Sequence, residues 1–195
     1  MVHRSTDFKN SAVYSLIILN VMFGTFASLI PTGSLTIFLL NMGLTIIEVA
    51  ISWHWWRTIP NEVRYTSLVC YLMSITFGIF ATIPLLRLTF GTMLFWLILL
   101  LYLMVLGYSI YLKELLFQAF HRPGKSKLSK GIAAFLLVLI IIGALSSRNG
   151  QEMLILSILN DHQGAIFVSL FSFIIGLFVT FTASSLLKKP EEIKG

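Results

Sequence analysis

The feature that most constrains this chain is the near absence of charge from its long apolar segments. Between Tyr65 and Leu112 the only charged side chain is that of Arg87. This run is too long for one crossing of a hydrocarbon core about 30 Å thick, which takes roughly 20 helical residues. Hydrophobic residues make up 57% of the chain and charged residues 11%, against about 45–50% and about 25% in soluble domains. The sequence therefore predicts an integral membrane protein.

Six apolar segments predict an all-α, polytopic fold with six transmembrane helices, and the whole chain, 1–195, forms a single transmembrane domain. The expected spans are 12–30, 34–53, 65–86, 89–112, 131–147 and 164–187. The expected breaks are Pro31-Thr32-Gly33, Pro60-Asn61, the segment from Pro84 through Arg87 to Gly91, and Pro123-Gly124. Membrane strands are excluded because the runs lack the alternation of a barrel strand, and an open sheet would leave backbone groups unpaired in lipid.

The basic residues segregate to one side of these six spans. That side carries Arg4, Lys9, Arg57, Arg64, Lys113, Arg122, Lys125, Lys127, Lys130, Lys188, Lys189 and Lys194; the opposite side carries only Arg87 and Arg148. The positive-inside rule then places both termini in the cytoplasm and the chain in the cell membrane. We expect the first span to be retained rather than cleaved as a signal peptide. The basic loops and tails that orient the protein in the membrane account for its net charge of +6. This charge therefore does not indicate a nucleic-acid partner, and none is expected.

The longest cytoplasmic connection, residues 113–130, combines apolar and basic halves. Its first half continues the fourth helix with apolar residues, and its second half carries Arg122, Lys125, Lys127 and Lys130. An interfacial helix beside anionic headgroups is the simplest interpretation. A docking surface for a cytoplasmic or membrane protein partner is the alternative.

The second span carries a polar stripe. At 100° per residue, five polar residues of this span lie within about 40° of one line along the helix. They are Asn41, Thr45, Glu48 and Ser52, together with Ser34 at the start of the span. Glu48 is the only Asp, Glu, Lys or Arg inside a predicted span. Polar groups in lipid are costly, so the stripe should face other helices or water. One interpretation is a proton or cation site, or part of a solute path; the other is a carboxyl that joins two helices by hydrogen bonds.

Small residues form stripes in two other spans. The third has Ser67, Cys70, Ser74, Gly78 and Ala81 on one face, and the sixth has Ala165, Ser169, Ser172, Gly176, Thr180 and Ala183. Small side chains let helix backbones approach closely in membranes. We therefore expect spans one, two, three and six to form the core, with the fourth and fifth facing lipid.

No catalytic, metal or cofactor site is predicted. Cys70 is the single cysteine and the four histidines lie outside the spans, so neither a disulfide nor haem ligation between helices is expected. Nucleotide-binding, hydrolase and metalloprotease motifs are missing. Asn160 and Gln163 are instead typical of a capping box that starts the sixth span.

Three functional hypotheses follow. The polar stripe with its single carboxyl favours a transport-related subunit that handles a small solute or ion together with a partner. The scarcity of motifs favours a non-catalytic regulatory or assembly subunit of a membrane complex. An intramembrane enzyme has the least support, because one carboxyl has no second group with which to share acid and base roles.

Overall fold

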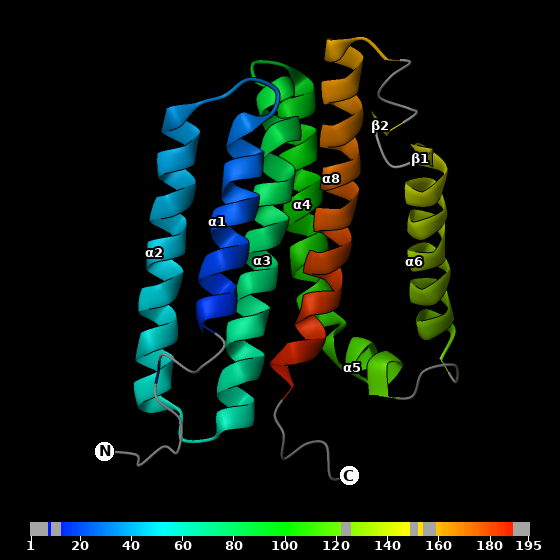
Figure 1. The fold of residues 1–195 in the computed structure, drawn as a ribbon. Coiled ribbons are helices and arrows are strands. Elements are labelled where there is room, and N and C mark those ends of the chain that lie inside the picture. Colours follow the sequence, from blue (N-terminus) through cyan, green and yellow to red (C-terminus); the bar gives the residue numbers. More distant parts are fainter. Residues whose placement is uncertain (1–7, 9–12, 122–125, 149–151, 154–158, 189–195) are drawn as a thin grey trace.

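The computed structural model describes residues 8, 13–121, 126–148, 152–153 and 159–188 (Figure 1). The elements in chain order are α1 (Val13–Leu29), α2 (Leu35–Thr58), α3 (Glu62–Leu88), α4 (Met93–Tyr111), α5 (Lys113–His121), α6 (Lys127–Ser146), β1 (Ser147–Arg148), β2 (Glu152–Met153), α8 (Asp161–Ala183) and η2 (Ser184–Leu187). Apart from the short antiparallel pair β1–β2, in which Ser147 lies opposite Met153, the described chain is helical.

The long helices stand side by side, and α5 lies across one end of them (Figure 1). We call the end that carries α5, η2 and the α2–α3 connection the lower end. The upper end carries the α1–α2 and α3–α4 turns and the start of α8. Because α1 begins and η2 ends at the lower end, the first and last described helices share one end of the bundle.

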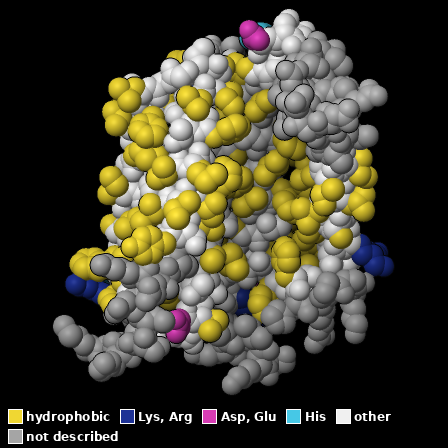
Figure 2. Space-filling view, in the orientation of Figure 1, with side chains coloured by type: hydrophobic (Ala, Val, Ile, Leu, Met, Phe, Trp, Pro, Cys, Tyr) yellow, Lys and Arg dark blue, Asp and Glu magenta, His cyan; other side chains and the backbone are white. Residues whose placement is uncertain are grey.

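Four helical segments are long and apolar enough to cross a bilayer: α2, α3, α4, and α8 together with η2. The fifth apolar helix, α1, has 17 residues. Hydrophobic side chains cover the visible side of the bundle, whereas the visible charged side chains lie near its ends (Figure 2). An apolar flank between charged ends is the surface expected of a helical membrane protein.

The central helix is α3, which packs against α1 and α2 on one side and against α8 on the other. Where α3 crosses α8, a Cβ atom added to Gly176 would lie 2.7 Å from the Cβ of Ala81, and one added to Gly78 would lie 3.2 Å from the carbonyl oxygen of Gly176. The two backbones therefore meet through glycine. At this crossing, small residues of the third and sixth spans allow the helix backbones to approach closely.

Two arginines of α3 bind the carboxyl ends of other helices. At the upper end, Arg87 donates hydrogen bonds to the carbonyls of Ala27, Ser28, Ile30 and Thr32, at 2.6–3.4 Å. At the lower end, Nη1 of Arg64 donates to the carbonyls of Leu187 and Lys188, at 2.7 and 3.1 Å. Terminal carbonyls have no hydrogen-bond donor within their own helix and carry partial negative charge. A guanidinium supplies both the donors and the opposite charge.

The outer parts of the fold agree with the expected lipid-facing spans. The buried residues of α4 are Tyr102 and Ser109. The helix α6 stands beside the bundle, and it contacts α8 through the stacked rings of Phe135 and Phe178, whose centroids are 4.7 Å apart. Much of the surface of α4 and α6 therefore remains free to face lipid.

Several helix limits differ from expectation. The second helix ends at Thr58 instead of 53, because its tryptophan-rich end stays helical, and α3 already begins at Glu62, where the Asn61 side chain caps it. Pro84 lies inside α3 rather than in the hairpin, which membrane helices tolerate. The hairpin itself turns at Gly91, whose φ of 81° suits glycine.

The apolar half of the 113–130 connection does not continue α4 as expected. The chain leaves α4 at Leu112, and α5 buries Leu116 and Ala119 against the bundle rather than only against lipid. Lys188 ties η2 to α5, since its Nζ lies 3.4 Å from Oε2 of Glu114. Lys127 and Lys130 lie exposed at the start of α6, whereas Arg122 and Lys125 lie outside the described residues.

Candidate intramembrane polar site

The polar stripe of the second span lies at the interface between α2 and its neighbours. Asn41, Thr45, Glu48 and Ser52 are the residues of α2 that are buried, with at most 5% of each exposed. The remaining faces of α2 carry large exposed side chains such as those of Leu39 and Ile46. The inward orientation predicted from the sequence is therefore correct; it does not by itself assign a function to these side chains.

Hydrogen bonds join this stripe to α1. The amide Nδ2 of Asn20 donates to Oε2 of Glu48. One turn further along α1, the carbonyl oxygen of Gly24 accepts a hydrogen bond from Nδ2 of Asn41 at 2.9 Å. The close approach at Gly24 makes this second bond possible, because a Cβ there would meet the Cβ of Asn41 at 3.1 Å. Two reciprocal amide contacts thus hold α1 and α2 together.

Two oxygen atoms of the stripe remain unpartnered among the described residues. They are Oε1 of Glu48 and Oγ of Ser52, and both are buried. The residues themselves are 4% and 0% exposed. A buried oxygen without a partner costs free energy, and a carboxyl oxygen can accept a proton, a hydrogen bond or a cation. The region around Glu48 therefore has unused binding capacity.

An apolar and aromatic layer separates this region from the lower end. Val13, Leu16, Tyr65 and Val69 form its buried core. The side chains of Val49, Trp55 and Trp56 pack against that core. The guanidinium of Arg57 lies 3.8 Å from the ring centre of Trp53, whose side chain is exposed. The charged lower surface and Glu48 are thus on opposite sides of a hydrophobic barrier.

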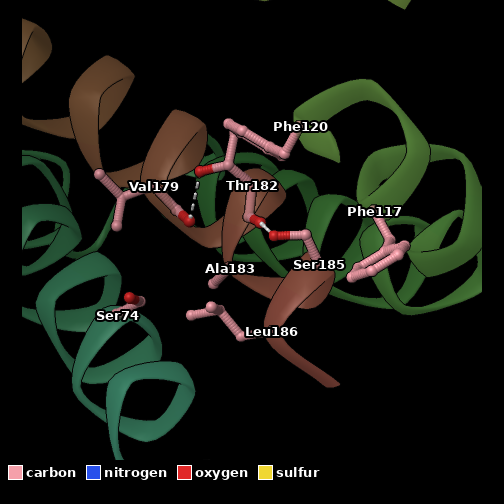
Figure 3. Close-up of a pocket in the computed structure, with 8 residues that line it drawn as sticks. All are labelled: Ser74, Phe117, Phe120, Val179, Thr182, Ala183, Ser185 and Leu186. Carbon is pink, nitrogen blue, oxygen red and sulfur yellow. Dashed lines mark hydrogen bonds between the residues drawn. The ribbon is translucent and has the colours of Figure 1, made fainter. Parts of the chain in front are cut away.

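Two surface hollows of the bundle lie elsewhere. The first, about 420 Å³, is at the lower end, where Phe117 and Phe120 of α5 face Val179, Ala183 and Leu186 across a gap (Figure 3). Its hydroxyl groups, on Ser74, Thr182 and Ser185, donate to carbonyls three or four residues earlier in the chain. The second, about 560 Å³, is at the upper end and includes Arg87. Neither hollow includes a residue of the Asn41–Ser52 stripe.

Asn20 is the site residue that the sequence did not pair with Glu48. It lies on the buried face of α1 together with the small residues Gly24, Ala27 and Ser28. A signal was present, because an amide in an apolar helix requires a polar partner. Among the described residues, no group of three or more His, Cys, Asp or Glu side chains is arranged to hold a metal ion.

Comparisons of the chain with protein-family models, with curated proteins and with solved structures found no match.

Proposed function

We propose that the chain is a six-span protein of the cell membrane that acts as a transport-related subunit, handling a small solute or ion together with a partner. The spans are α1, α2, α3, α4, α6 and α8 with η2. The lower end, with both termini, faces the cytoplasm. The basic residues concentrated at that end support this orientation through the positive-inside rule.

One observation carries the transport proposal, namely the unpartnered Oε1 of Glu48. Asn20 donates to one carboxyl oxygen, whereas the other oxygen and the hydroxyl of Ser52, four residues further along α2, have no partner among the described residues. Ionisable groups inside membrane spans are costly and commonly mark ion or proton pathways. In the proposed role, Glu48 takes up and releases a proton, or binds a small cation, while Asn41 and Thr45 line the same route.

A different observation favours a regulatory or assembly subunit as the second candidate. The apolar layer formed by Val13, Leu16, Tyr65 and Val69 closes the lower side of the polar site, and neither surface hollow reaches Glu48. In this alternative the Asn20–Glu48 and Asn41–Gly24 bonds serve only to hold α1 on α2.

The topology is tested with single cysteines placed at Ser126 and Asn149 in a Cys70→Ala background. A membrane-impermeant maleimide added to intact cells should label the cysteine at position 149 and should reach position 126 only after the membrane is opened. Labelling of both positions from the same side would contradict the six-span topology.

The role of Glu48 is tested by comparing Glu48→Gln and Glu48→Ala in proteoliposomes loaded with a pH-sensitive dye. Glutamine keeps the size and an acceptor for Asn20 but cannot exchange a proton. The transport proposal expects normal abundance and thermal stability for Glu48→Gln, with proton flux lost. Glu62→Gln, the same change at the exposed start of α3, is the matched control and should keep the flux.

The opposite outcome would assign Glu48 a structural role. If Glu48→Ala lowers thermal stability and abundance while Glu48→Gln behaves as the unchanged protein in every flux measurement, Glu48 is structural. A stable Glu48→Ala protein with full flux would also end the transport proposal in this form.

A further inference from the structure

The upper-end hollow combines a cation with an apolar wall at the end of the membrane-spanning helices. Its polar rim consists of Ser34 and Thr36 of α2 and Arg87 of α3. Its walls are apolar: Ile37, Ile83, Leu86, Phe90 and Phe95. Because α2 starts and α3 ends here, the rim lies at headgroup depth and the walls reach toward the hydrocarbon.

The guanidinium of Arg87 has donors to spare despite its role at the end of α1. Nη1 serves the carbonyls of Ala27, Ser28 and Ile30, and Nη2 serves that of Thr32. A guanidinium has five N–H donors in a fixed plane. Nε–H lies on the edge of the guanidinium that also carries Nη2, and no described atom accepts a hydrogen bond from Nε. The Nε–H edge of Arg87 therefore has an unused donor with which it can bind an oxyanion.

No charged side chain of the described residues balances the positive charge of this hollow. No carboxylate among the described residues lies within ion-pair distance of Arg87, whereas Lys188 at the lower end does pair with Glu114. The carbonyls around Arg87 carry only partial negative charge, which does not cancel the full positive charge of the guanidinium. The amino terminus of α2, which begins at the rim after Ser34, adds partial positive charge. The hollow therefore complements an anion.

We propose that this hollow binds one phospholipid with an anionic headgroup from the upper leaflet. The phosphate binds the Nε–H edge of Arg87, with the hydroxyls of Ser34 and Thr36 nearby, and an acyl chain lies against the walls at Phe90 and Phe95. A volume of about 560 Å³ admits a headgroup and the first part of a chain, and the rest extends along the exposed apolar surfaces of α2 and α4. This inference is independent of the transport proposal.

Native mass spectrometry of the whole protein, released from detergent micelles, tests the proposal. The probes are palmitoyl-oleoyl phosphatidylglycerol and palmitoyl-oleoyl phosphatidylcholine at equal concentration. We expect one retained phosphatidylglycerol per chain and several-fold less phosphatidylcholine. Equal retention of the two lipids would overturn the proposal, and so would displacement of the lipid by free glycerol phosphate at the same concentration, since the ligand would then be a soluble anion.

Thr36→Glu is the decisive variant because it leaves Arg87 and its carbonyl partners in place. Thr36 is exposed in the first turn of α2, where a carboxylate is tolerated by the helix dipole, so the fold should be kept. The added negative charge should lower phosphatidylglycerol retention about tenfold, and the matched Thr36→Gln variant should retain it. Unchanged retention in Thr36→Glu would refute the site.

A second pair of variants tests the contact with the Nε–H edge. Arg87→Lys keeps the charge but removes the planar edge, so phosphatidylglycerol retention should fall. Arg64→Lys makes the same change at the lower end and should leave retention unchanged, and a thermal melt of both variants checks that each remains folded. An equal fall in the two variants would show a general charge effect and overturn the assignment to this hollow.

Discussion

Gly176→Ala is the substitution whose cost follows most directly from the geometry of the α3–α8 crossing. The new Cβ would lie 2.7 Å from the Cβ of Ala81, whereas ordinary contacts begin at 3.4 Å. The difference, about 0.7 Å, must come from separating two helices, because neither atom belongs to a flexible side chain. A gap of ~0.5–1 Å already forfeits a quarter to a half of each dispersion contact along the interface.

We expect a net loss of ~0–2 kcal/mol in the free energy of unfolding, from an overpacking cost of ~1–3 kcal/mol less a helix-propensity gain of ~1 kcal/mol, and therefore a loss of ~1–3 kcal/mol relative to a glycine-to-alanine change without a clash. Reversible unfolding in mixed detergent micelles measures it. Gly43→Ala is the matched control, because nothing lies within 4 Å of its new Cβ, and it isolates the propensity gain.

A compensating substitution sharpens this test. Ala81→Gly removes the opposing Cβ, so it should cost less stability in the Gly176→Ala background than in the unchanged protein, where only its loss of helix propensity counts. If Gly176→Ala proves as stable as Gly43→Ala, or if Ala81→Gly costs the same in both backgrounds, the close crossing of α3 and α8 is wrong.

Three further substitutions test other contacts by thermal or detergent unfolding. Asn160→Ala removes the side-chain acceptor of the Gln163 amide at the start of α8 and should cost ~0.5–2 kcal/mol; an unchanged melt would contradict the capping box. Asn20→Leu leaves Glu48 without its donor, so it should lower the free energy of unfolding more in the unchanged protein than in a Glu48→Leu background. Equal losses in the two backgrounds would contradict the pairing of Asn20 with Glu48. Tyr102→Phe removes a hydroxyl that donates to the Ile75 carbonyl at 3.2 Å and should cost ~0.5–1.5 kcal/mol, with no loss expected if that bond is unimportant.

The burial of the α2 stripe was predictable, because one polar face on an apolar helix has only one favourable environment. Asn41, Thr45, Glu48 and Ser52 are for this reason the buried residues of α2. The partner of Glu48 was not predictable from the same pattern. Periodicity shows which face of a helix is turned inward but not which neighbouring helix meets it, and Asn20 lies 28 residues away in the chain.

The arginine contacts of α3 show a second limit of sequence patterns. Arg64 and Arg87 were both interpreted as markers of orientation, but each also binds the end of a distant helix. Those acceptors exist only because α1 and η2 end where they do, which is a property of the fold. The break at Leu112 was missed for a related reason, since no proline or glycine marks it and the apolar character continues into α5.

The two arginines of α3 also set an order for the biosynthesis of the protein. The carbonyls at the end of α1 have no hydrogen bond from Arg87 until that residue has been synthesised, 57 residues after Ile30. Arg64 in turn waits for Leu187, 123 residues later, which takes roughly 6–25 s at about 5–20 residues per second. A ribosome that stops before η2 therefore leaves the Arg64 guanidinium, at the lower end of α3, without the carbonyls of Leu187 and Lys188 that bind it in the finished protein.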